Sequence, residues 1–278
     1  MAMRLPNTSR SYQAETEELL VGKGDYVIGG ARSPPFLDLD NARHRRPVVY
    51  GEALDSLDGY PDSAAEMFSG RQTDVEEWAV MWKELGADGI CLRLTREDSP
   101  ELVKRISERT RIPVMVSADT DILLRTATEV DGTVLILACR DEEQSLEVSA
   151  ACNNHIVVAK CRDDPCGLCR KMNERGAKNV IVDLGEGRMD DSLRVLRHRM
   201  ESYRMDGLNG VPDSRHTIIC DVTPSWEVHG SGVSARRASM HEAMVALSVM
   251  MSGADILVMK GPGAADMARV YGEELADL

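Results

Sequence analysis

Eight short runs of apolar, largely β-branched residues recur along the chain, and each run is continuous rather than alternating with polar residues. Continuous apolar runs are typical of strands that are buried on both faces, as in a parallel sheet covered by helices. The predicted strands are Pro47 to Tyr50, Gly89 to Leu94, Ile112 to Val116, Thr133 to Ala138, His155 to Ala159, Asn179 to Leu184, Thr217 to Val222 and Ala254 to Met259.

Segments with helical periodicity separate these strands. Thr73 to Glu76 has the form of a capping box and opens a helix whose apolar stripe includes Trp78. A later helix carries Met244 and either Met250 or Met251 on its apolar stripe, and we expect these methionines to fill the core.

Eight strands, each followed by a helix, most simply close into a (β/α)8 TIM barrel of the α/β class. The alternative is an open doubly wound sheet, which usually shows a glycine-rich fingerprint after its first strand, and none is present there. We therefore predict a barrel over residues 46–278, preceded by an N-terminal extension over residues 1–45 that is partly mobile. Within it, Gly24 to Phe36 is expected to form a hairpin that plugs the barrel floor.

Composition agrees with a large aliphatic core, since 43% of the 278 residues are hydrophobic but only 4% are aromatic. The net charge of −13 disfavours nonspecific attraction to nucleic acid or an anionic membrane. The first residues have no apolar signal region, and no run of eighteen apolar residues occurs, so we expect a cytoplasmic protein.

In a barrel of this kind, function is located at the C-terminal ends of the strands, and polar residues follow most of the predicted strands. Among them are Arg93, Ser117 to Thr120, Cys139–Arg140, Lys160–Cys161, Asp183, Asp221 and Lys260 to Gly263.

Three carboxylates at these ends, Asp119, Asp183 and Asp221, could orient a pterin-like ring or act as acids and bases. The alternative is that they cap the following helices. Gly261 and Pro262 could likewise form an anion cradle at a helix N-terminus, or only the tight turn that links a strand to a helix. No HExxH, GxSxG or Walker motif is present, so no catalytic residue is predicted.

Three of the seven cysteines, Cys161, Cys166 and Cys169, fall within nine residues, with the spacing of plant-type ferredoxin ligands. Asp164 and Pro165 match an N-cap and a first helical position, which would place Cys166 and Cys169 on one helical face near the positive end of the dipole. The alternative is that these cysteines are small core residues in a strand-to-helix turn.

A fourth thiol lies at the end of the preceding strand. Neighbouring parallel strands are about 4.8 Å apart, so Cys139 could join the cysteine run at the same rim. Together the four thiols would hold a [4Fe–4S] cluster or zinc, with Cys220 as a weaker substitute, whereas Cys91 and Cys152 are expected to be structural.

Several segments resemble the delta subunit of the acetyl-CoA decarbonylase/synthase complex, which is the small subunit of the corrinoid iron–sulfur protein. The similarity is scattered from about residue 25 to 275, and the order and spacing of the segments agree with a barrel. The segments are Ile28 to Phe36, Pro47 to Asp55, Glu77 to Ala79, Gly86 to Leu94 and Met251 to Met259.

This resemblance implies a barrel that helps to hold a cobamide shared with a large corrinoid iron–sulfur subunit, in a heterodimer of the kind found in archaeal methanogens. A methyl group would pass between a methyl-tetrahydropterin and the corrinoid, with the chain acting either as a methyltransferase or as a non-catalytic subunit. The chain departs from the family at Ser117 to Thr120, at Val182 to Gly185 and in its cysteine run. The chain is therefore expected to be a diverged member or paralogue.

Two other hypotheses are retained. One is a stand-alone, homodimeric barrel metalloprotein, either an iron–sulfur enzyme or a pterin-dependent methyltransferase, that uses the Cys161, Cys166 and Cys169 site. The other is a barrel that has lost activity and serves assembly alone.

Overall fold

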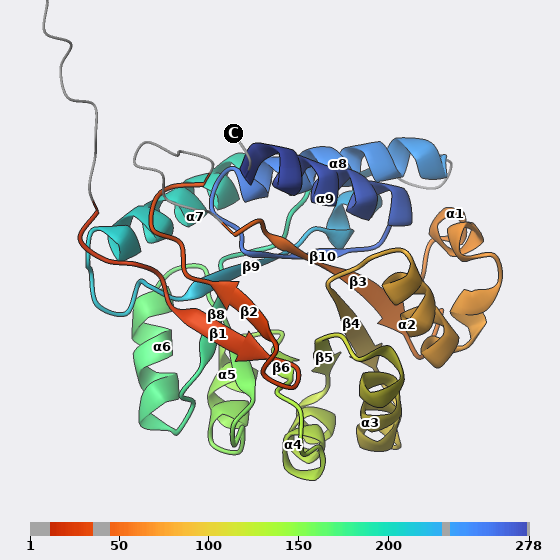
Figure 1. The fold of residues 1–278 in the computed structure, drawn as a ribbon, viewed down its shortest axis with the longest axis horizontal. Helices are drawn as coiled ribbons and strands as arrows, with labels where there is room; N and C mark the ends of the chain where they lie inside the picture. Colours follow the sequence, from red (N-terminus) through yellow and green to blue (C-terminus); the bar gives the residue numbers. More distant parts are fainter. Residues whose placement is uncertain (1–11, 36–44, 230–233, 277–278) are drawn as a thin grey trace, which may run out of the picture.

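The computed structural model describes residues 12–35, 45–229 and 234–276, and eight of its strands close into a parallel barrel. The strand order around the barrel is β10-β3-β4-β5-β6-β7-β8-β9, so each strand pairs with its neighbours in sequence, and β10 closes on β3 (Figure 1). The barrel strands are β3 (Val48–Leu54), β4 (Gly89–Leu94), β5 (Val114–Ala118), β6 (Ile136–Ala138), β7 (Ile156–Lys160), β8 (Val180–Asp183), β9 (Thr217–Asp221) and β10 (Ile256–Met259). The predicted (β/α)8 barrel is confirmed.

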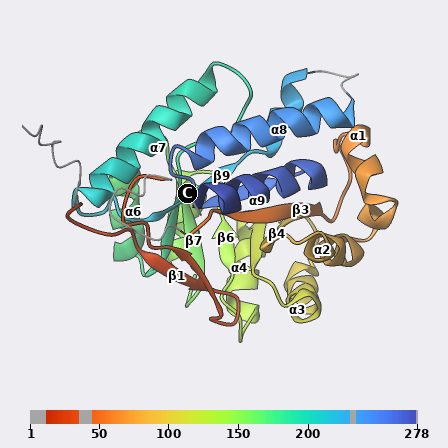
Figure 2. The same ribbon diagram turned by 45° about the horizontal axis from the view of Figure 1, so that its top comes forward.

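Helices surround the barrel and connect its strands (Figures 1 and 2). The α-helices are α1 (Asp62–Ala65), α2 (Val75–Glu84), α3 (Ser99–Thr110), α4 (Thr120–Glu129), α5 (Glu142–Ser149), α6 (Pro165–Glu174), α7 (Ser192–Leu208), α8 (Ala235–Met250) and α9 (Pro262–Ala276). The described residues also form the 3₁₀ segments η1 (Glu66–Phe68), η2 (Arg71–Thr73) and η3 (Thr223–His229). None of the helices in the described ranges combines the length and apolar character needed to cross a bilayer.

Two helix predictions need correction. The N-cap of α2 is Asp74, whose Oδ1 accepts hydrogen bonds from the N–H groups of Glu76 and Glu77, because η2 already includes Thr73. On α8, Met250 is buried, which agrees with one of the two expected alternatives, whereas the Met244 side chain, like that of Met251, is about half exposed. The small residues Ala243 and Ala246 are buried beside Met244, which lies on the outer surface.

Alternate residues of the strands fill the barrel interior with apolar side chains. The opposite faces of the same strands pack against the helices in a second, larger core. The interior layer consists of Tyr50, Cys91, Met115, Ile136, Ile156, Val158, Ile181, Ile219, Ile256 and Val258. Apart from Tyr50, this layer is aliphatic or sulfur-containing, as the low aromatic content requires.

An antiparallel hairpin precedes the barrel and lies at its N-terminal end (Figures 1 and 2), where its side chains join the interior layer. Its strands are β1 (Glu18–Val21) and β2 (Tyr26–Gly29), and their side chains Leu19, Val21 and Ile28 are buried in the interior cluster. The expected hairpin at Gly24 to Phe36 therefore lies earlier in the chain, at residues 18–29, and Phe36 is outside the described residues. The apolar run Leu19 to Val21 supplies its first strand.

Candidate functional site

Six charged side chains lie at the C-terminal mouth of the barrel, two residues beyond the interior layer on their strands. Because residues i and i+2 of a strand share one face, these side chains continue the interior face upward to the mouth. They are Glu52, Arg93, Lys160, Asp183, Asp221 and Lys260, and we call them the charged ring. The ring contains three carboxylates and three cations. At the level of Arg93, strands β5 and β6 contribute the uncharged Ser117 and Ala138 in register.

Arg93 connects two of the ring carboxylates across the mouth. Its Nε donates to Glu52 Oε1, and its Nη2 donates to Asp221 Oδ2 over 2.7 Å. Asp221 Oδ1 accepts two further hydrogen bonds, from the N–H and the hydroxyl of Thr223 at 3.0 and 2.8 Å. Burial raises the pKa of Asp221, but the Arg93 charge and the Thr223 donors outweigh burial and leave the pKa below its ordinary value. Asp221 is thus held as a carboxylate.

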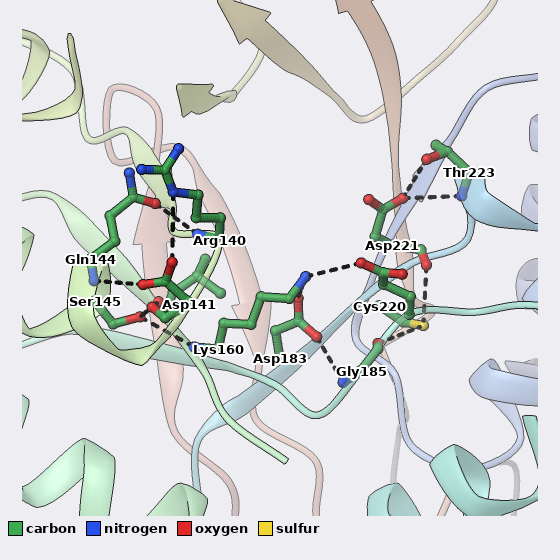
Figure 3. Close-up of polar contacts among 12 residues, drawn as sticks. Arg140, Asp141, Gln144, Ser145, Lys160, Asp183, Gly185, Cys220, Asp221 and Thr223 are labelled. Carbon is green, nitrogen blue, oxygen red and sulfur yellow. Dashed lines mark hydrogen bonds and ion pairs between the residues drawn. The ribbon is translucent and has the colours of Figure 1, made fainter. Parts of the chain in front are cut away.

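Lys160 and Asp183 form a second ion pair between adjacent strands, and they are partners in the β7–β8 register. Lys160 Nζ lies 3.3 Å from Asp183 Oδ2 and 3.6 Å from Glu186 Oε1. Figure 3 shows the lysine extending along the mouth toward Asp183, whose Oδ1 accepts from the Gly185 N–H at 2.8 Å. A buried acceptor, Asp183, and a partly buried donor, Lys160, therefore lie side by side.

The two aspartates of the ring have opposite electrostatic environments. Burial raises the pKa of Asp183, and the nearby Lys160 charge and Gly185 N–H only partly oppose this rise. The pKa of Asp221 is lowered, as described above. Two carboxyl groups whose pKa values are pushed apart can take different roles in proton transfer, and Asp183 is the one better suited to carry a proton.

Lys260 completes the ring and lies beside an aromatic side chain. Its Nζ is 3.7 Å from Glu52 Oε2 and 4.9 Å from the centre of the Tyr60 ring, a cation–π distance. The Tyr60 hydroxyl and Glu52 Oε2 are buried and have no hydrogen-bond partner among the described residues. Buried polar atoms of this kind are normally satisfied by water or a ligand, so this part of the mouth suits a polar molecule.

The predicted anion cradle at Gly261 and Pro262 is filled by a side chain of the protein itself. Glu242 of α8 accepts hydrogen bonds from the N–H groups of Lys260 and Gly261 at 2.5 and 2.9 Å, and from Trp226 Nε1 at 2.8 Å. Glu242 is fully buried, and burial raises its pKa to about 8 against the opposing effect of these donors. The backbone donors of the turn are thus engaged by an internal carboxyl group, which an external anion would have to displace.

Asp119 lies at the rim rather than in the charged ring. Its side chain is mostly exposed, and its Oδ1 accepts from Arg140 Nη1 at 2.5 Å. Asp119 is also the residue before α4, but its side chain makes no capping hydrogen bond there. Of the three predicted carboxylates, the structure therefore brings Asp183 and Asp221 into the ring, and Asp119 stands apart with Arg140.

The four predicted thiol ligands are separately engaged. Cys161 donates to Glu142 Oε1 at 3.0 Å, Cys166 shares a 3.1 Å hydrogen bond with the Ser214 hydroxyl, and Cys139 contacts the Leu137 carbonyl at 3.8 Å. Cys169 is fully buried in the outer core. Within the described part of the chain, no three His, Cys, Asp or Glu side chains are grouped as metal ligands would be. The four-thiolate metal site remains a prediction without support from the arrangement of these thiols.

The local structure around the cysteine run follows the sequence prediction. Asp164 caps α6 by accepting the Gly167 N–H at 2.9 Å, and Pro165 is the first helical residue. Cys166 and Cys169 consequently lie one turn apart on α6. The substitute ligand Cys220 is fully buried, with its thiol directed at the Gly185 carbonyl, 3.8 Å away (Figure 3).

Four ring members were not among the predicted cofactor-binding residues. Arg93, Lys160 and Lys260 are predicted only as polar residues at strand ends, and Glu52 lies beyond the predicted end of its strand at Tyr50. The sequence signal for all four is their spacing, because a residue two positions after an interior residue keeps its side chain on the interior face.

Fold and site together define a closed (β/α)8 barrel with a charge-balanced C-terminal mouth. No protein-family model matches the chain. Among solved structures, the dihydropteroate synthases of Vibrio fischeri and Burkholderia cenocepacia share the fold, with TM-scores of 0.60 and 0.59 and sequence identities of 14% and 13%. These alignments cover 84% and 95% of this chain and 94% and 98% of the two synthases.

Curated proteins show a more specific sequence similarity. The chain is 22% identical to the acetyl-CoA decarbonylase/synthase complex subunit delta of Methanopyrus kandleri, over 90% of this chain and 70% of the relative. It is 24% identical to the same subunit of Methanothermobacter thermautotrophicus, over 95% of this chain and 77% of the relative. The chain is thus similar to this delta subunit over at least 90% of its own length, as a diverged relative.

Proposed function

We propose that the charged ring binds a tetrahydropterin and that the chain takes part in methyl transfer between a methyl-tetrahydropterin and a corrinoid. The observation that carries this proposal is the Lys160–Asp183 pair, in which a partly buried ammonium and a buried carboxylate oxygen lie 3.3 Å apart. The pyrimidine edge of a pterin presents N–H donors beside a carbonyl acceptor. A carboxylate and an ammonium placed side by side are complementary to that edge.

The uncharged part of the mouth supports the same ligand. Ser117 and Ala138 stand between Arg93 and Lys160 around the barrel, so this arc leaves a surface without charge for the flat heterocycle. Two similarities support a pterin. The resemblance to delta subunits implies a methyl-tetrahydropterin donor. A Burkholderia cenocepacia dihydropteroate synthase with the same fold, at TM-score 0.58 and 14% identity, is complexed with 7,8-dihydropteroate.

In this proposal the corrinoid is held mainly by a large partner subunit. The ring supplies carboxylates, amines and a guanidinium, and none of its six members offers an imidazole nitrogen of the kind that commonly ligates a metal. The ring thus fits a polar heterocycle better than a cobalt ion. When bound, the corrinoid would supply a nucleophilic cobalt, while this chain orients the pterin through Asp183 and Lys160.

Isothermal titration calorimetry of the purified chain with methyl-tetrahydropterin tests the proposal. We expect the wild-type chain to bind and the Kd of Asp183→Asn to be at least tenfold higher, which is a loss of about 1.4 kcal/mol or more in binding free energy. Asp119→Asn is the matched control, because Asp119 lies outside the ring, and it should bind as the wild type does.

A second measurement separates binding from transfer. The assay monitors methyl transfer from the pterin to a reduced cobamide through the visible spectrum of the cobamide. We expect transfer only when this chain is present, either alone or together with a large corrinoid subunit. Failure of the wild-type chain to bind the pterin, or equal binding by Asp183→Asn, would contradict the proposed site.

A further inference from the structure

The cysteine run has an arrangement that the proposed function does not use. All seven cysteines lie in the described part of the chain, six of them are buried, and Cys166 alone is partly exposed. Cys169 lies one helical turn further along α6 and is fully buried. A Cys-x-x-Cys pair at the start of a helix, with a partly exposed first thiol and a buried second thiol, is typical of dithiols that exchange with disulfides.

The neighbours of each thiol indicate which one would react first. Cys161 donates its S–H to the Glu142 carboxylate, a partner that disfavours a second negative charge on the sulfur. Cys166 instead contacts the neutral Ser214 hydroxyl at 3.1 Å, and its thiol is the one that is partly exposed among the seven. Cys166 is therefore the nucleophile that the surroundings favour.

We propose that Cys166 and Cys169 form a reversible dithiol–disulfide site that reacts with low-molecular-weight disulfides. The Cys166 thiolate attacks one sulfur of the small disulfide, which forms a mixed disulfide and releases one thiolate. The Cys169 thiolate then attacks the Cys166 sulfur, which closes the intramolecular disulfide and releases the second thiolate. The two cysteines lose two electrons and two protons in total, and the small disulfide gains them to become two thiols.

Closure of this bond requires a local movement of α6. Cβ atoms three residues apart on a helix are about 5–6 Å apart, whereas a disulfide needs about 3.8 Å. The first turn must therefore tighten, and this movement would draw Cys166 away from Ser214. The segment that moves, the first turn of α6, begins at Pro165, five residues after Lys160 of the charged ring.

The test is to incubate the reduced full-length chain with glutathione disulfide and to identify the modified thiols by alkylation and peptide mass spectrometry. We expect the wild type to lose two alkylatable thiols and to yield a Cys166–Cys169 linked peptide, two hydrogens lighter than the reduced form. Cys169→Ser should stop at the mixed disulfide and keep one glutathionyl group on Cys166. Cys169→Ala is a second variant in case the buried serine hydroxyl destabilises the fold.

Two control variants complete the experiment. Cys166→Ser should leave all remaining thiols unmodified in the folded chain, and Cys152→Ser, which removes a buried thiol outside the run, should behave as the wild type. The proposal is overturned if the wild type keeps seven alkylatable thiols. It is also overturned if glutathione accumulates on Cys166 without transfer to Cys169, which would mark a merely exposed thiol. None of these outcomes depends on pterin binding.

Discussion

Arg93 reaches across the mouth of the barrel to Asp221, with 2.7 Å between Nη2 and Oδ2, although two strands, β3 and β10, separate β4 from β9. The same guanidinium also binds Glu52, so one cation compensates two acidic side chains that would otherwise repel each other. This arrangement makes Arg93 the central member of the charged ring.

Replacement of Arg93 by methionine should destabilise the barrel. Removing one partner of a buried ion pair typically costs about 3–5 kcal/mol, and we expect about 2–3 kcal/mol here because the mouth is partly open to solvent. Urea denaturation measures this loss. Adding Glu52→Gln to the variant should recover part of it, since the uncompensated carboxylate is then removed. Arg105→Met, which breaks an exposed pair with Glu76, should cost less than about 1 kcal/mol. Equal losses for the two arginines would contradict this account.

Glu242 should make the stability of the chain fall as pH rises. Its pKa is raised from 4.5 to about 8 in the folded protein, so folding favours the protonated form. The resulting stabilisation is fully present below about pH 4.5 and is lost as pH rises through about 8, with a magnitude on the order of 5 kcal/mol. The free energy of unfolding of Glu242→Gln should vary less over this range than that of the wild type. Parallel pH profiles would show that Glu242 does not titrate there.

Gly51 should not tolerate a side chain. A Cβ atom at this position would lie 2.0 Å from Cδ2 of Trp82, because the outer face of β3 packs directly on α2. We expect Gly51→Ala to cost about 3 kcal/mol, measured by urea denaturation. Gly263→Ala is the comparison, since a Cβ there meets nothing within 4 Å and Gly263 lies in α9. It should be neutral or stabilising by about 0.5 kcal/mol. A neutral Gly51→Ala would show that Trp82 can shift.

The N-terminal hairpin should contribute to the stability of the barrel. Ile28 is buried in the interior cluster, so Ile28→Ala should cost about 2–4 kcal/mol. Leu20 is 56% exposed on the other face of its strand, and Leu20→Ala should change stability by no more than about 0.5 kcal/mol. Chemical denaturation of the two variants, monitored by circular dichroism, provides the comparison. If both variants have the same free energy of unfolding as the wild type, the hairpin does not stabilise the barrel.

The fold could be predicted because its signal is repeated eight times. Each strand is buried on both faces, so each appears as a continuous apolar run, and an error of a few residues at one run, as at Thr133 to Ala138 against β6, does not change the topology. The helix start at Asp164 and Pro165 was also predictable, since capping depends on adjacent residues alone.

The site was only partly predictable, because its pairings connect distant parts of the chain. The contact of Arg93 with Asp221 spans 128 positions, and no local pattern specifies which acid an arginine meets. The same reason explains why Gly261 was interpreted as an anion cradle. The turn does present backbone donors, but the acceptor is Glu242, which arrives from the preceding helix. The cysteine run was recognised by spacing, whereas the partners Glu142 and Ser214 could come only from the fold.

The hairpin at residues 18–29 has a consequence for the order of events in the proposed reaction. Leu19, Val21 and Ile28 fill the N-terminal end of the barrel with the protein's own apolar side chains, so the charged mouth is the side from which a polar ligand approaches. A small donor and a bulky acceptor would then share a single entrance. In the proposed reaction, the donor would therefore enter before the acceptor closes over it, and the spent donor would leave only after the acceptor withdraws.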